Sequence, residues 1–300
     1  MRCYLAASIA VVLLGGPAGA AELTGTLKKI QETGELNIAY RESSIPFSYL
    51  ADKQQPVGFA MDICYKIAEA VKTELRLAKL EIKLTPVTSS TRIPLMANGT
   101  TDLECGSTTN NVERQKQVWY TNSHFLTAAK YVTKVTAGIK RIADLKGKTI
   151  TSTAGSTNIK QITELNAAES LGLTIIPVKD VADGFLMLET DRAVAFFNDD
   201  VVLASLVAVS KDPKLYVVSE DATSLPEPYG IMLPKDDVPF KKLADATTRA
   251  LYTSPELPKL YAKWFLEPIP PKGVNLNMPM PDVVRRAFAN PSDNPDPKSY

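Results

Sequence analysis

Residues 104–114 read Glu-Cys-Gly-Ser-Thr-Thr-Asn-Asn-Val-Glu-Arg, and they follow a short strand-like run that ends at Leu103. This stretch contains a glycine, Gly106, then three hydroxyl side chains, two amides and the guanidinium of Arg114. Backbone amides beside a glycine, hydroxyl donors and a bidentate guanidinium together suit a small carboxylate. The stretch therefore predicts a carboxylate-binding loop directly after a strand.

Strand-like and helix-like segments alternate around this loop. On the N-terminal side, strands are expected at 35–40, 81–87 and near Leu103, with helices at 58–71 and 88–99 between them. Strands joined by helices predict right-handed βαβ units and an α/β fold with mostly parallel sheets. A second set of such units begins near Tyr131 and continues to about residue 219. The segment from Pro268 onward is rich in proline and asparagine, and we expect it to wrap around the protein rather than build a core.

Several polar residues follow the ends of the expected strands. In open α/β sheets, ligands bind outside the carboxyl ends of the strands. Any one arginine there could be a solvated surface charge, but three arginines beside serine or threonine favour a shared site. These residues are Arg41, Ser89, Arg92, Ser107, Thr109 and Arg114.

The second set of units contributes two further candidates. Thr157 lies in a turn before an expected helix, whose free amide groups could hold an anion. Asp199 follows directly after the expected strand at 193–198.

The first 21 residues have the pattern of a secretory signal peptide. Arg2 precedes an apolar run at 4–14, and Ala18-Gly19-Ala20 fits a cleavage site for small residues. The alternative is a membrane anchor, but a span needs about 20 apolar residues. Cys3 lies too early for a lipoprotein cleavage site. We therefore expect an exported protein that is soluble and free of the membrane.

Composition and spacing exclude several classes of site. The formal net charge is +1, which gives no indication of a nucleic-acid surface. With His124 as the only histidine, neither a metal site nor a Ser-His-Asp triad is expected, and no cofactor is predicted. Export permits a disulfide, so Cys64 and Cys105 are either a pair or two buried thiols.

Taken together, these residues resemble the periplasmic solute-binding proteins of amino-acid ABC transporters (solute-binding protein family 3), and most closely the glutamate/aspartate-binding proteins. The resemblance covers essentially the whole mature chain. Among the matching segments are Arg41-Glu-Ser-Ser-x-Pro-Phe-Ser48, Thr88-Ser-x-x-Arg-Ile-Pro-Leu95, residues 104–115, Asp144-Leu-Lys-Gly-Lys148, Asp199-Asp200 and Lys263-Trp-Phe265.

The resemblance implies a type II periplasmic-binding-protein fold. One lobe would hold residues 22–126 and 230–300, and the other would hold residues 127–229. Two crossing strands, near 125–133 and 227–234, would join the lobes and allow hinge closure on the ligand. The resemblance also implies a monomer that delivers its ligand to a permease and an ATPase.

The same resemblance assigns a role to each candidate residue. Arg114, Thr109 and Thr157 would bind the α-carboxylate of an acidic amino acid, L-glutamate or L-aspartate. Asp199 and Ser107 would contact its ammonium group. The side-chain carboxylate would lie against the remaining three, Arg41, Ser89 and Arg92.

A charge count agrees with an acidic ligand. Three arginines and Asp199 give the site a net charge of +2, so an amide ligand would leave guanidinium charge unpaired. Close relatives have a histidine where this chain has Val181, so we expect weaker affinity or looser discrimination against glutamine and asparagine. An enzyme on the same fold, such as a periplasmic dehydratase, would need a general acid in the cleft, and Glu104 and Glu42 are the available carboxylates.

Overall fold

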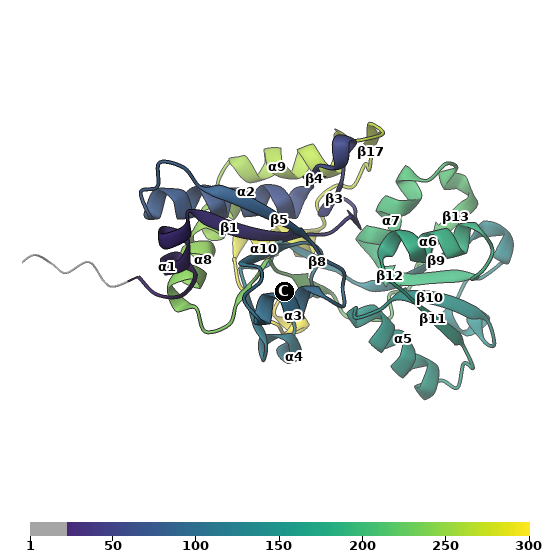
Figure 1. Ribbon diagram of the computed structural model, residues 1–300. Helices are drawn as coiled ribbons and strands as arrows, with labels where there is room; N and C mark the ends of the chain where they lie inside the picture. Colours follow the sequence, from purple (N-terminus) through teal and green to yellow (C-terminus); the bar gives the residue numbers. More distant parts are fainter. Residues whose placement is uncertain (1–22) are drawn as a thin grey trace, which may run out of the picture.

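The computed structural model describes residues 23–300, which form two lobes (Figure 1). The predicted signal peptide lies outside the described residues. Lobe 1 is built on a sheet of five strands in the order β5-β1-β6-β15-β7, and lobe 2 on a sheet in the order β11-β10-β12-β9-β13. The strands of lobe 1 are β1 (Glu35–Tyr40), β5 (Glu81–Pro86), β6 (Leu103–Cys105), β7 (Val118–Tyr120) and β15 (Met232–Pro234). Those of lobe 2 are β9 (Ala129–Lys134), β10 (Thr149–Thr153), β11 (Thr174–Val178), β12 (Ala195–Asp199) and β13 (Tyr216–Val218).

Each sheet is mostly parallel, as predicted, with a single antiparallel strand among its five: β15 in lobe 1 and β9 in lobe 2. In lobe 1, β1 pairs in parallel with β5 and β6, whereas β15 pairs antiparallel with β6 and β7. Lobe 2 repeats this arrangement, with β9 antiparallel to β12 and β13. Strands joined by a helix are parallel, but β9 and β15 each enter a sheet directly from a segment that crosses between the lobes. Such an entry reverses the direction of the strand.

Two short antiparallel strands connect the lobes. They are β8 (Phe125–Thr127) and β14 (Glu227–Tyr229), which pair with each other in a separate two-stranded sheet. Both strands lie at positions where the sequence predicted crossings. Each leads within a few residues into the sheet of the next lobe, β8 into β9 and β14 into β15.

Helices cover both faces of each sheet (Figure 1). In lobe 2, Phe196 packs in the same cluster as Phe185 of α6, while Phe197 packs with Ile162 of α5 on the opposite face. Successive strand residues point to opposite faces, so one strand packs against the helices on both faces of the sheet. The lobe 2 helices are α5 (Thr157–Ala168), α6 (Val181–Glu189) and α7 (Asp200–Val209). Those of lobe 1 are α1 (Gly25–Thr33), α2 (Phe59–Glu74), α3 (Arg92–Ala97), α4 (Val112–Gln115), α8 (Val238–Tyr252), α9 (Glu256–Phe265) and α10 (Asp282–Ala289).

Shorter elements complete the fold. Short strands are β2 (Ser43–Ser44), β3 (Ser48–Leu50), β4 (Pro56–Val57), β16 (Pro268–Ile269) and β17 (Val274–Asn275). Single turns of 3-10 helix are found at Asp52–Gln54, Val135–Ala137, Ile142–Leu145, Pro213–Leu215 and Pro297–Ser299. Within residues 23–300, no helix combines the length and apolar character that crossing a bilayer requires.

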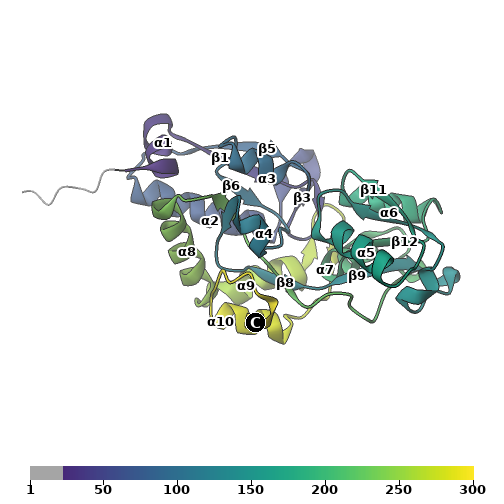
Figure 2. The same cartoon turned by 90° about the horizontal axis from the view of Figure 1, so that it is seen from below.

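The C-terminal segment contributes to the core, contrary to expectation. Helix α10 buries Val284, Ala287 and Phe288, and the Phe288 ring lies 4.8 Å from that of Tyr252 between centroids. The spacing of these three residues places them on one helical face. The proline and asparagine residues around α10 obscured that pattern. The residues after α10 do wrap, and the C-terminus lies against lobe 1 close to α10 (Figure 2).

Candidate functional site

Hydrogen bonds hold the loop after β6 to two other segments of the chain. Its Asn110 amide donates a hydrogen bond to the carbonyl of Pro228 at 2.8 Å, and the Gly230 amide donates to the carbonyl of Thr108 at 3.1 Å. Both partners belong to the segment that crosses between the lobes. The Asn110 side chain donates to the carbonyl of Asp293, in the C-terminal segment, at 2.8 Å. The loop geometry is therefore set by parts of the chain that are distant in sequence.

Arg114 extends from this loop to the other lobe. Asn111 begins α4 by accepting a hydrogen bond from the Arg114 amide at 2.9 Å. The guanidinium, 7% exposed, donates from Nη1 to the carbonyl of Thr109 at 2.8 Å and from Nη2 to the carbonyl of Gly155 at 3.3 Å. The hydroxyls of Thr109 and Thr157 lie 3.4 Å apart. Three of the candidate residues thus meet where the lobes touch.

These three residues line a cavity of about 640 Å³ between the lobes. Glu227 of β14 also lines it, and its carboxylate accepts a hydrogen bond from the Gln161 amide at 2.8 Å. Burial and, next, the negative charge of Asp199 raise the pKa of Glu227 to about 8. The other candidates, including Arg41 and Arg92, do not line this cavity.

Arg41 lies directly after β1 and is 1% exposed. Its amide donates to the Ser48 hydroxyl at 2.9 Å, which fixes the backbone at the strand end. The guanidinium Nη2 forms an ion pair with Asp180 of lobe 2. Asp180 is also the cap of α6 and accepts from the Val181 amide at 2.8 Å. The Arg41 Nε has no hydrogen-bond partner among the described residues.

Arg92 is the first residue of α3 and is 2% exposed. Its Nη1 donates to the Thr108 hydroxyl and, at 3.3 Å, to the carbonyl of Ser107. The same nitrogen lies 3.9 Å from Oε1 of Glu104, which is fully buried. Within residues 23–300, the Nε of Arg92 has no hydrogen-bond partner.

Positive charge is concentrated around Arg92. Burial and the positive charges of Arg114 and Arg41 lower the pKa of Arg92 to about 10, against the opposing effect of Glu104. Arg92 is therefore still protonated at neutral pH. An anionic group bound among these guanidinium groups would relieve their mutual repulsion.

Asp199 ends β12 and is 4% exposed. Its carboxylate accepts from the Asn158 amide at 2.8 Å and from the Tyr229 hydroxyl. Burial raises the pKa of Asp199, and these two hydrogen bonds offset part of that effect. Tyr229 belongs to the crossing strand, so the Asp199 carboxylate is tied to the connection between the lobes.

The two candidate serines lie in lobe 1. The Ser107 hydroxyl donates to the hydroxyl of Ser44 at 3.2 Å. Ser89, 6% exposed, precedes α3. Its neighbour Ser90 donates a hydrogen bond to the carbonyl of Ala154 in lobe 2 at 2.9 Å. The turn before α3 therefore contacts the opposite lobe directly.

Residues 36–267 match the model of the bacterial extracellular solute-binding proteins, family 3. The chain belongs to this family. It is 47% identical over 96% of both chains to a protein of Pseudomonas aeruginosa named L-glutamate/L-aspartate-binding protein. It is 42% identical over 98% of both chains to the glutamate/aspartate import solute-binding protein of Escherichia coli. These relatives are binding proteins.

Solved structures of amino-acid-binding proteins share the fold of this family 3 protein. A mutant of ArgBP from T. maritima superposes with a TM-score of 0.71 at 25% identity, covering 80% of this chain and 99% of that one. A substrate-binding protein from Streptococcus pneumoniae with bound histidine gives 0.72 at 19% identity, covering 81% and 97%. The two-lobed α/β fold predicted from the sequence is therefore confirmed.

The structure of this family 3 protein adds carboxylates that the sequence-based charge count left out. That count set three arginines against Asp199 alone, and the value of +2 is wrong because Glu104 lies against Arg92 and Asp180 against Arg41. Asp180 follows the end of β11, so the rule that located the other candidates could have found it. Glu227 lies in a crossing strand, where no comparable pattern marks it.

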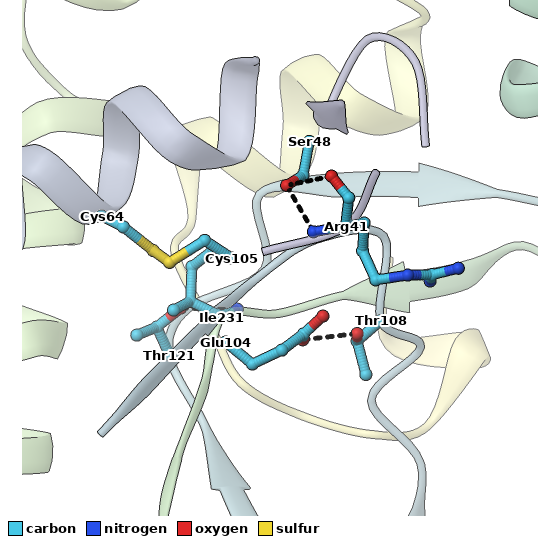
Figure 3. The surroundings of a disulfide bond; sticks show 8 residues. All are labelled: Arg41, Ser48, Cys64, Glu104, Cys105, Thr108, Thr121 and Ile231. Carbon is cyan, nitrogen blue, oxygen red and sulfur yellow. Dashed lines mark hydrogen bonds between the residues drawn. A yellow bond between two sulfur atoms is a disulfide. The ribbon is translucent and has the colours of Figure 1, made fainter. Parts of the chain in front are cut away.

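A disulfide joins Cys64 of α2 to Cys105 at the end of β6 (Figure 3). Their Cα atoms lie 6.2 Å apart. Cys105 is flanked by Glu104 and by Gly106, so the bridge anchors the start of the candidate loop to α2. Of the two alternatives left open by the sequence, the structure shows the pair.

His124 has no hydrogen-bond partner at either ring nitrogen in the described part of the chain. It is fully buried beside Phe47, with ring centroids 5.8 Å apart. Burial lowers the pKa of His124 to about 3, and the nearby backbone of Gly106 offsets only part of that effect. Residues 23–300 contain no cluster of three or more histidine, cysteine, aspartate or glutamate residues suited to a metal ion.

Proposed function

We propose that this protein captures an acidic amino acid, L-glutamate or L-aspartate, between its lobes and delivers it to an ABC importer. The observation that carries the proposal is the pair of buried guanidinium groups at Arg41 and Arg92. Each keeps an Nε donor without a partner among the described residues. Buried polar groups without partners are rare and costly, and a carboxylate would satisfy both donors. The names of the relatives from P. aeruginosa and E. coli point to the same ligands.

The proposed roles divide the site by lobe and by ligand group. The α-carboxylate lies against the guanidinium of Arg114 and the hydroxyls of Thr109 and Thr157. The ammonium group faces Asp199, with Ser107 beside it. The side-chain carboxylate takes the remaining donors, which belong to Arg41, Ser89 and Arg92.

Hinge closure completes the proposed mechanism. Residues 127–229 would move as one body against residues 22–126 and 230–300, about the paired strands β8 and β14. The protein acts as a periplasmic monomer, exported by residues 1–21, and hands the ligand to a permease and an ATPase. It binds the ligand without chemical conversion.

A second specificity is favoured by the surroundings of Arg41. Its guanidinium already has Asp180 as a counter-ion, and the neighbouring Val181 is a buried apolar residue. Both features reduce the advantage of an acidic side chain over an amide. A broader specificity that includes glutamine and asparagine is therefore the alternative.

A thermal-shift panel of all common amino acids on refolded, ligand-stripped protein tests the proposal. Glutamate or aspartate should raise the melting temperature most, because only the folded, closed protein binds them. Glutamine and asparagine should raise it less, and lysine and arginine should leave it unchanged. A rise with a basic amino acid and none with either acid would overturn the proposal.

A further inference from the structure

A buried carboxylate lies directly behind one of the proposed ligand-binding arginines. Glu104 of β6 is 0% exposed. Its Oε2 accepts a hydrogen bond from the Thr108 hydroxyl at 2.6 Å (Figure 3), and that hydroxyl in turn accepts from Nη1 of Arg92. The Thr108 hydroxyl therefore links the carboxylate to the guanidinium through two hydrogen bonds. Oε1 of Glu104 lies 3.9 Å from the same Arg92 nitrogen.

Packing holds this carboxylate in one place. A Cβ atom at Gly106 would lie 2.5 Å from Oε1 of Glu104 and 2.9 Å from Cγ of Arg41. The carboxylate thus lies against the backbone of the loop, close to the side chains of Arg41 and Arg92. Any side chain at position 106 would displace one of them. Glycine is required here by the close approach of Glu104 and Arg41.

The position of Glu104 has an electrostatic consequence for the ligand. Its Oε1 has no hydrogen-bond partner among the described residues, so its charge is balanced mainly through Arg92. A ligand carboxylate on Arg92 would share that guanidinium with Glu104. In a buried site, two carboxylates on opposite sides of one guanidinium group are close enough to repel each other measurably. An amide side chain would feel no such repulsion.

We propose that Glu104 is a specificity-determining residue that acts through Arg92. By offsetting part of the guanidinium charge, it reduces the preference of the cleft for an acidic side chain over its amide. It also orients Arg92 through the Thr108 hydroxyl. This inference rests on the proposed function, since it concerns the strength of acid selection in the same site.

The test is the ratio of the Kd for glutamine to the Kd for glutamate, measured by calorimetry. Glu104→Gln keeps the size of the side chain and removes its charge, and the ratio should rise about ten-fold. Thr108→Val is the matched control, because it removes the hydroxyl that links Glu104 to Arg92 but keeps every charge. Because Arg92 faces the ligand side chain, a less well oriented Arg92 should lower the ratio, and a rise like that in Glu104→Gln would assign the effect to the hydrogen bonds and not to the charge.

A second variant guards against loss of folding in Glu104→Gln. Glu104→Asp keeps the carboxylate but moves it away from Arg92 by about the length of one methylene group, so the ratio should rise by a smaller factor. An unchanged or lower ratio in Glu104→Gln, or in Glu104→Asp if the first variant does not fold, would overturn the inference. Failure of the wild-type protein to bind glutamate would instead overturn the proposed function.

Discussion

Arg41 of lobe 1 and Asp180 of lobe 2 form an ion pair across the interface between the lobes. A neighbouring hydrogen bond crosses the same interface, from the Ala182 amide to the Ser43 hydroxyl at 3.3 Å. Asp180 also caps α6, the helix that contains Ala182. Arg41 is also one of the residues proposed to bind the ligand side chain. Lobe closure and recognition of the acidic group therefore share one guanidinium.

Removing the Asp180 charge should weaken closure. In Asp180→Asn, Arg41 would lose its counter-ion in the closed form, and truncating one partner of a buried charge pair is costly. We predict a larger radius of gyration for the ligand-free variant by small-angle X-ray scattering. We also predict that its affinity for glutamate falls by roughly ten-fold.

Asp183→Asn is the matched control for that variant. Asp183 accepts from the Asp180 amide at 3.2 Å in the capping box of α6, so the control weakens the same helix end. It does not remove the partner of Arg41. Equal effects of the two variants would assign the change to the helix cap and not to the ion pair.

Two arginine substitutions separate the proposed carboxylate sites. Lysine keeps the charge but loses the bidentate fork of a guanidinium. Arg114→Lys should weaken glutamate, glutamine, aspartate and asparagine by similar factors, roughly ten-fold or more. Arg92→Lys should mainly reduce the preference for acids over amides. Calorimetry with the four ligands distinguishes the variants, and identical selectivity profiles would contradict the assigned roles.

The raised pKa of Glu227 predicts a pH dependence of stability. Its folded-state pKa is about 8, above the usual value for glutamate, so the folded protein holds this proton more tightly than the unfolded chain. The resulting stabilisation is present at acidic pH and is lost as the pH rises through about 8. The free energy of unfolding of the wild type should therefore fall, relative to that of Glu227→Gln, between about pH 5 and pH 9.

Urea titrations across this range measure the difference. Glu267→Gln, at an exposed position, is the control and should keep the pH profile of the wild type. Parallel profiles for the wild type and Glu227→Gln would show that Glu227 does not hold a proton in the folded state.

The disulfide should stabilise the protein and depend on redox conditions. Cys64 and Cys105 are 41 residues apart, and closing a loop of that length contributes about 3–4 kcal/mol in the chain-entropy model. A reductant should lower the free energy of unfolding of the wild type by about that amount. The Cys64→Ala/Cys105→Ala double variant should start lower and show no response to the reductant, whereas a response there would point to another cause.

Much of the fold was predictable from local patterns. The spacing of Phe59, Ile63, Ile67 and Val71 indicated α2, and all four residues are buried on one face. The rule that ligands lie at the carboxyl ends of strands led to Arg41, Arg92 and Asp199. These features depend on residues close together in sequence, which is why the sequence reveals them.

Long-range features were not predictable in this way. The direction of β15 depends on its entry from the other lobe, and the partner of Arg41 is a residue 139 positions away. The burial of Glu104 against Arg92 depends on how the loop after β6 folds back. Such contacts leave no periodic signal in the sequence, so the charge count omitted Glu104 and Asp180.

The most direct test of acidic-ligand capture is a calorimetric titration of refolded, ligand-stripped protein with glutamate, aspartate, glutamine and asparagine. We predict binding at one site per chain for at least one of the acids, tighter than for its amide. No heat with either acid, together with tight binding of a neutral or basic amino acid, would contradict the proposed role of Arg41 and Arg92.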